Sequence, residues 1–228
     1  MIRIRDLQFG YGGRLVIDCA RMDFEAQQVH GIVGLNGAGK STLFQLLTRY
    51  LKPRQGAIEW EGRNMQRKDT GYLETHNYFY TNLTGNEYLD IFPRSNKDFQ
   101  LERLNELFQL PLNEVTEAYS TGMKKKLALL AILQQDRPVY IFDEPFNGLD
   151  LESGRVVELM IAHLKAKGKT VLVSAHTLGP LLQGCDQVHL LRNGVFAVSY
   201  GRNEFDRIER ELFDDFNRKA GDLVRSGF

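Results

Sequence analysis

The sequence predicts an α/β fold with a mostly parallel sheet, an antiparallel β region at the N-terminus and an inserted α-helical region. Two observations lead to this prediction. Apolar runs of strand length stand at 29–33, 139–142 and 170–174, and such runs are typical of buried parallel strands. Segments with helical periodicity follow the first two runs. Strands that alternate with helices favour a parallel sheet.

A glycine-rich loop connects the first of these strands to its helix. The loop residues are Gly34, Leu35, Asn36, Gly37, Ala38, Gly39, Lys40, Ser41 and Thr42. Glycines let backbone N–H groups approach phosphate oxygens, and the N-terminus of the following helix adds a partial positive charge. We expect Lys40 to reach the β- and γ-phosphates and the Ser41 hydroxyl to ligate Mg²⁺. This context predicts a P-loop NTPase core that binds a nucleoside triphosphate.

Length and composition fit a single domain over residues 1–228. The formal net charge is zero, which argues against a general nucleic-acid binder, because such binding requires a surplus of basic side chains. Cys19 and Cys185 are too few and too scattered for a disulfide framework, so we expect buried thiols in a reducing compartment. No segment reaches the about 18 apolar residues that span a bilayer. We therefore expect a cytoplasmic protein whose membrane role depends on a partner.

In the N-terminal region apolar and charged residues alternate, which is typical of an antiparallel strand with one solvent-exposed face. This pattern covers residues 2–9, a turn follows at 10–13, and further strands are expected at 14–18 and 21–24. Tyr11 lies in the turn, where it either stacks on a nucleotide base or is an ordinary turn residue. Stacking would give little base discrimination, since every base has a π-face.

The middle of the chain is rich in helical patterns. A strand and turn at 57–62 and a short strand at 71–73 come first, followed by helical stripes at 84–92 and 101–108. We expect residues from about 75 to 135 to form a helical subdomain inserted into the α/β core.

Residues 119–126 begin the last helix of this subdomain. Ser120 is expected to cap it, and Gly122 keeps its first turn open for close approach. Three lysines follow at 124–126. They favour either an anion site at the helix N-terminus or a solvated basic face.

Two acidic residues end the strand at 139–142. Asp143 and Glu144 stand where open α/β sheets place their ligands, and buried charges of this kind require a partner such as Mg²⁺ and a water. The turn that ends at Asp150 caps a helix at 151–165. His176 follows the strand at 170–174, and its place beside the nucleotide loop favours a functional role.

The C-terminal region contains a hairpin and a tail. Strands at 187–191 and 195–200 are expected around the turn at 193–194. The tail, at 203–228, carries an amphipathic pattern from 204 to 224, which predicts a helix packed on the domain.

The order of these motifs resembles the ATP-binding subunit of an ABC (ATP-binding cassette) transporter, from about residue 3 to 201. The resemblance implies that the loop at 34–42 is the Walker A loop and that Asp143 holds Mg²⁺ through water. It implies that Glu144 is the general base that orients the attacking water and that His176 contacts the γ-phosphate. The expected activity is ATP hydrolysis with ATP and Mg²⁺ as cofactors, Lys40 contributing to catalysis.

The resemblance also implies a dimer and a membrane partner. Tyr11 is similar to the aromatic residue that stacks on adenine. Ser120 and Gly122 match the signature that contacts the ATP held by a second subunit, and Asp150 stands where the family couples the two sites. The implied assembly is a head-to-tail dimer that drives a separate permease from the inner face of the cell membrane.

Two departures from the family pattern qualify this resemblance. Thr121 and Met123 replace the usual Gly and Gln of the signature, a variant similar to the drug and lantibiotic export branch. Glu74 and Thr75 stand where the family has Pro and a Gln that ligates Mg²⁺. The sequence leaves open which of the two replaces the glutamine. It also leaves open the transported molecule, the pairing with itself or with a homologue, and an alternative role as a soluble ABC ATPase in assembly or regulation.

Overall fold

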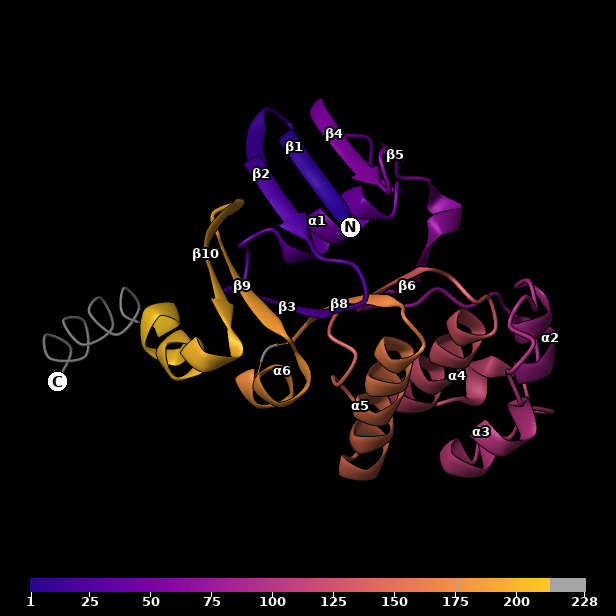
Figure 1. The fold of residues 1–228 in the computed structure, drawn as a ribbon. Coiled ribbons are helices and arrows are strands. Elements are labelled where there is room, and N and C mark those ends of the chain that lie inside the picture. The colour runs from indigo at the N-terminus through magenta and orange to yellow at the C-terminus, as the bar shows by residue number, and fades with distance from the viewer. Residues whose placement is uncertain (176, 214–228) are drawn as a thin grey trace, which may run out of the picture.

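Two sheets with helices on both sides of the larger one form the architecture (Figure 1). The structure is a computed structural model, and it describes residues 1–175 and 177–213. The smaller sheet has the order β2-β1-β4-β5 and the larger one the order β10-β9-β3-β8-β7-β6. The smaller sheet lies above α1 and the larger sheet lies below it in the view of Figure 1.

The smaller sheet is the predicted antiparallel region. Its strands are β1 (Ile2–Tyr11), β2 (Arg14–Phe24), β4 (Gln55–Trp60) and β5 (Arg63–Asn64). Alternation along β1 buries Ile2 and Ile4 completely, so one face of the sheet packs on the core and the other faces water. The prediction of separate strands at 14–18 and 21–24 was wrong, because β2 pairs with β1 along its whole length.

The larger sheet contains the three predicted parallel strands, β3 (Val29–Val33), β7 (Val139–Phe142) and β8 (Thr170–Ser174). The short strand β6 (Thr70–Leu73) and the first strand of the predicted hairpin, β9 (Gln187–Arg192), also run parallel in it, with β10 (Val195–Gly201) antiparallel at the edge. Every residue of β3, β7 and β8 is buried, which explains their continuous apolar sequences. Since β3, β8, β7 and β6 run parallel, the residues that follow them gather at one edge.

Helices cover both faces of this sheet. They are α1 (Lys40–Leu47), α2 (Gly85–Asp90), α3 (Leu101–Phe108), α4 (Thr121–Leu133), α5 (Leu151–Ala166) and α6 (Leu178–Gly184). One apolar cluster joins α1 to both sheets, and a second joins the opposite face to α4, α5 and α6. The helix α6 was not predicted, because Gly179 and Pro180 interrupt its pattern.

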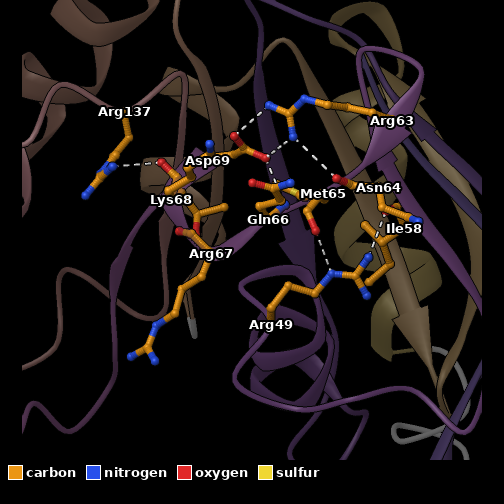
Figure 2. A network of polar contacts seen from close by, with 11 residues as sticks. Arg49, Ile58, Arg63, Asn64, Met65, Gln66, Arg67, Lys68, Asp69 and Arg137 are labelled. Carbon is orange, nitrogen blue, oxygen red and sulfur yellow. Dashed lines mark hydrogen bonds and ion pairs between the residues drawn. The ribbon is translucent and has the colours of Figure 1, made fainter.

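A polar network fixes the chain between the two sheets (Figure 2). Both Arg63 guanidinium amino groups donate to the Asp69 carboxylate, at 2.7 and 2.8 Å. The backbone N–H of Gln66 donates to the same carboxylate at 2.8 Å, and the Arg63 hydrogen bond holds the pKa of Asp69 below its ordinary value. Arg49 donates to the Met65 carbonyl oxygen at 2.8 Å. The segment that enters β6 is thereby held at several points.

The chain beyond β10 is only partly described. A 3₁₀ turn at Arg202–Arg207 continues into a helical stretch at 208–213, where Ile208 is buried. This agrees with the start of the predicted amphipathic tail. The remainder of the expected helix, at 214–224, lies outside the described residues.

Candidate functional site

The phosphate loop has the geometry that its sequence predicts. The residue before α1 is Gly39, whose φ of 103° is left-handed, and glycine adopts this conformation without steric cost. Gly34 lies so close to β9 that a Cβ on it would stand 2.4 Å from the Leu191 carbonyl oxygen. The loop therefore turns tightly from β3 into α1, with the first N–H groups of the helix open to an anion.

Lys40 is the cation of this loop. It is buried, and its Nζ donates to the Gly34 carbonyl oxygen at 2.7 Å. Burial lowers the pKa of Lys40, while the charges of Glu144 and Asp143 act in the opposite direction. The ammonium group thus lies within electrostatic reach of the predicted general base Glu144 and the predicted Mg²⁺ ligand Asp143, which places the cation and both acids in one site.

A cleft of about 720 Å³ opens over the loop. Of the predicted site residues, the cleft is lined by Tyr11, Asn36, Gly37, Ala38, Gly39, Lys40, Ser41, Thr42 and Glu144. Tyr11 is 52% exposed and makes a T-shaped contact with Phe9, so much of its side chain is open to solvent at the cleft. Gly34 lies beneath the loop, where its carbonyl oxygen holds Lys40.

The cleft also has walls that sequence reasoning missed. They are Arg14, Leu15, Val16 and Asn193. The turn at 193–194 is attached to the loop, because the Gly194 N–H donates to the Ala38 carbonyl oxygen at 3.0 Å. The Gly194 carbonyl oxygen accepts from the Asp18 N–H at 3.0 Å. The sequence marks Asn193 as a hairpin turn residue but not as a cleft residue, because only the packing of the β9–β10 hairpin brings it to the loop.

Asp143 and Glu144 are connected by a buried hydroxyl. Ser174, at the end of β8, is fully buried, and its Oγ donates to Asp143 Oδ1 at 2.7 Å. Ser174 Oγ also accepts from the Glu144 N–H at 3.0 Å. One serine therefore orients the carboxylate of the first acid and the backbone of the second. In the sequence, only the place of Ser174 at a strand end points to this role.

The Glu144 residue is fixed on further sides. Its φ is 53°, a left-handed conformation that few residues other than glycine adopt. Asn147 Nδ2 donates to Glu144 Oε2 at 2.8 Å. Lys125 Nζ donates to the Glu144 carbonyl oxygen at 2.8 Å. Glu144, whose side chain lines the cleft, is thus held at its backbone and at one carboxylate oxygen.

One of the two alternatives for the lysines at 124–126 was a solvated basic face. Lys125 is only 4% exposed, and burial lowers its pKa while the charges of Glu144 and Asp143 oppose this shift. That alternative was wrong at Lys125, because the helix start packs on the segment after β7. Lys124 and Lys126 are partly exposed.

Ser120, Gly122 and Asp150 do not line the cleft. Ser120 caps α4 as predicted, with its Oγ accepting from the Met123 N–H at 3.2 Å. Asp150 caps α5 by accepting from the Ser153 N–H at 2.7 Å and from the Ser153 hydroxyl at 2.9 Å. The backbone hydrogen bond lowers the pKa of Asp150 to about 2. Within one chain, these predicted nucleotide contacts lie away from the phosphate loop.

The residues predicted for Mg²⁺ suit a hard cation. Ser41 lines the cleft, and the buried Asp143 uses one carboxylate oxygen for Ser174. Hydroxyl and carboxylate oxygens, completed by phosphate oxygens and water, are the donor set that Mg²⁺ prefers. Among residues 1–175 and 177–213 no group of three or more His, Cys, Asp and Glu side chains could hold a metal on its own. A site that depends on the phosphates of the nucleotide requires no such group.

Glu74 and Thr75, which stand where the family has Pro and Gln, lie near Asp143. Thr75 Oγ1 is 3.5 Å from the Asp143 carbonyl oxygen, which is long for a hydrogen bond. Burial raises the pKa of Glu74, with Arg67 opposing the shift and the charge of Asp143 adding to it. The predicted catalytic His176 lies outside the described residues.

Both cysteines are free and buried, as the sequence predicts. Within the described part of the chain, no helix has the length and apolar character needed to cross a membrane.

Comparisons with known proteins identify the family of this chain. The family model described as ABC transporter matches residues 17–147. The ABC-type transporter ATP-binding protein EcsA of Bacillus subtilis is 30% identical, over 85% of this chain and 84% of its own length. The lantibiotic transport ATP-binding protein SrtF of Streptococcus pyogenes is 27% identical, over 94% of this chain and 96% of its own. A solved ATP-binding subunit of an ABC transporter is 27% identical, covers 93% of this chain and 94% of its own, and superimposes with a TM-score of 0.83.

Proposed function

Because the chain belongs to the ABC transporter family as an ATP-binding subunit with ATPase activity, we propose that two subunits pair head to tail around two ATP molecules. Hydrolysis then drives a separate membrane permease. The observation that carries this proposal is the division of the predicted site. Tyr11, the phosphate loop and Glu144 line one cleft, whereas Ser120 and Gly122 lie outside it. A second subunit would bring the missing groups to the nucleotide.

The predicted site residues have distinct roles in the proposed reaction. Tyr11 stacks on the adenine, and the loop N–H groups and Lys40 hold the phosphates. Ser41 and, through water, Asp143 hold Mg²⁺, which neutralises charge on the transferred phosphoryl group when it is bound. Glu144 orients the attacking water and accepts its proton. The family resemblance assigns His176 a contact with the γ-phosphate, which belongs to this proposal.

A membrane partner is supported by exposed aromatic side chains beside the loop at 74–75. Tyr78 is 74% exposed, and its ring packs edge-on against Tyr80, which is also exposed. Exposed aromatics that contact each other are typical of interaction sites rather than of bare surface. We place the permease contact here, which brings the subunit to the cytoplasmic face of the membrane.

The signature variant supports a proposal for the direction of transport. Thr121 and Met123 make this segment similar to the drug and lantibiotic export branch, and one relative is named as a lantibiotic transport protein. We propose export on this basis.

Glu144→Gln tests the enzymatic part of the proposal. The variant keeps the shape of the side chain but cannot accept a proton, so kcat should fall by on the order of 10²–10⁴-fold while ATP binding persists. Turnover near that of the wild type would contradict the assignment. Glu102→Gln is a matched control on the exposed surface of α3 and should retain full activity. An ATP-dependent doubling of the mass of Glu144→Gln in solution would support the dimer.

Co-purification from solubilised membranes tests the transport part. A multi-spanning membrane protein that is retained with the tagged chain supports the permease. Retention of soluble proteins alone would instead favour a soluble ABC ATPase in assembly or regulation.

A further inference from the structure

The buried ammonium group of Lys125 contacts the backbone of the proposed general base. Lys125 lies at the start of the second turn of α4, and the residue is 4% exposed. Its Nζ donates to the Glu144 carbonyl oxygen at 2.8 Å. A hydrogen bond from a charged donor is stronger than a neutral one, and its strength increases where water is excluded. The backbone of Glu144 is therefore held from a different element of the fold.

The conformation of Glu144 depends on contacts of this kind. Its φ of 53° is left-handed, and such a conformation persists only where the surroundings over-determine it. Ser174 Oγ accepts from the Glu144 N–H at 3.0 Å, so the N–H is held by β8 and the carbonyl oxygen by α4. Rotation of either peptide would redirect the carboxylate that lines the cleft.

Two more contacts join the start of α4 to the segment after Glu144. A Cβ on Gly122 would lie 2.8 Å from the Gly148 carbonyl oxygen, so the two backbones nearly touch. Lys126 Nζ lies 3.5 Å from Asp150 Oδ2. Because three successive contacts link the same helix start to the same short segment, a displacement of one is transmitted to the other.

We propose that Lys125 is a positioning residue for ATP hydrolysis, which holds Glu144 in its working direction and connects it to the start of α4. The inference rests on the proposed function, in which Glu144 is the general base and Ser120 and Gly122 contact ATP bound by the partner subunit. Engagement of α4 by the partner's ATP thereby orders the base of the subunit that provides Ser120. ATP binding at one nucleotide site is then coupled through α4 to the general base of the other site.

Replacement of Lys125 in the purified full chain tests the inference. Lys125→Met keeps the apolar stem and removes the donor, so kcat should fall about 10–100-fold, while the Kd for ATP stays within about 2-fold because Lys40 and the loop are intact. Lys125→Gln still offers an amide N–H, so its kcat should lie between those of Lys125→Met and the wild type. The protein concentration at which the rate per subunit is half-maximal should not change.

Lys169→Met is the matched control. Lys169 is a partly buried lysine, with its Nζ 2.6 Å from Asp136 Oδ1, and it directly precedes β8, at the opposite end of that strand from Ser174. Its replacement should lower the melting temperature without a change in kcat. This control separates general destabilisation from loss of positioning.

A wild-type kcat in Lys125→Met would overturn the inference, and so would an equal loss of kcat and of ATP affinity. If Lys125→Met does not fold, Lys125→Gln decides: a reduced kcat with normal ATP affinity supports positioning, and a wild-type kcat contradicts it. Glu144→Gln is measured in parallel. If it is inactive while Lys125→Met is active, only this inference falls. If Glu144→Gln turns over normally, the proposed function falls as well.

Discussion

Ser174 shows how a single hydroxyl can organise the two acids that follow β7. It donates to Asp143 at 2.7 Å and accepts from the backbone of Glu144 at 3.0 Å. A buried carboxylate that loses a hydrogen bond is destabilised, and its direction becomes less well defined. The residue at the end of β8 thus determines the geometry of the residues at the end of β7.

Ser174→Ala should therefore lower kcat about 10-fold, since a charge-assisted hydrogen bond contributes about 1.5–3 kcal/mol. Steady-state ATPase assays over a range of Mg²⁺ concentrations measure this effect. We also expect a higher Mg²⁺ requirement, because Asp143 is less well oriented. Thr48→Val is the control: it removes a buried hydroxyl that donates to the Phe44 carbonyl oxygen, and it should lower stability with kcat unchanged. An unaltered Mg²⁺ dependence and kcat in Ser174→Ala would show that the hydroxyl has no role in positioning.

At the scale of elements, β3 and β9 are joined by a pair of buried histidines. His30 Nδ1 lies 3.1 Å from His189 Nε2, and His189 Nδ1 lies 2.7 Å from Ser199 Oγ. Burial lowers the pKa of both, that of His189 to about 3. The two rings are therefore neutral in the folded protein at neutral pH. Because β3 leads directly into the phosphate loop, their pairing supports the strand that carries the site.

This pair predicts a loss of stability in mild acid. An unfolded histidine takes up a proton near pH 6.5, whereas folded His189 does so only near pH 3. The unfolded state therefore binds more protons between these values, so the free energy of unfolding declines as the pH falls through that window. His189 alone should contribute about 2 kcal/mol of this decline between pH 7.5 and pH 5.

Urea unfolding of the wild type and of His189→Gln at several pH values measures this contribution. The variant should be less stable at pH 7, because it loses the bond to Ser199, but its stability should depend less on pH. Parallel curves for the two proteins would mean that His189 is not responsible for the acid sensitivity.

At the scale of the whole molecule, the nucleotide site is completed only by a second subunit in the proposed dimer. Lys40→Ala damages the phosphate loop of its own chain, and Ser120→Arg damages the signature that the chain offers to its partner. Each variant alone should be inactive. In a mixed dimer one of the two sites joins an intact loop to an intact signature, so a random mixture should recover about a quarter of the wild-type rate.

ATPase assays of the two variants before and after mixing test this prediction. A mixture of Lys40→Ala with Glu144→Gln is the matched control: both defects lie on the same side of the site, so every site in the mixture is defective and no activity should return. A wild-type rate per subunit that stays constant on dilution would also contradict the requirement for a dimer.

The sequence by itself determined the order of the strands along the chain and most of the predicted residues that line the cleft. The loop at 34–42, the acids at 143–144 and the buried strands are local patterns, and a phosphate loop is built from consecutive residues whose backbone conformation depends on their own glycines. The same holds for Ser120 and Asp150, because a helix cap bonds to residues three positions away.

Only the tertiary structure decided what surrounds these motifs. Ser174, Lys125 and Asn193 reach the site from β8, α4 and a hairpin turn that are distant in sequence. Lysine is mostly exposed in proteins, so its sequence position gives no sign of burial. Whether such a side chain is solvated or buried against a backbone carbonyl depends on which surfaces pack together. That packing is set by long-range burial of apolar faces, which no local pattern specifies.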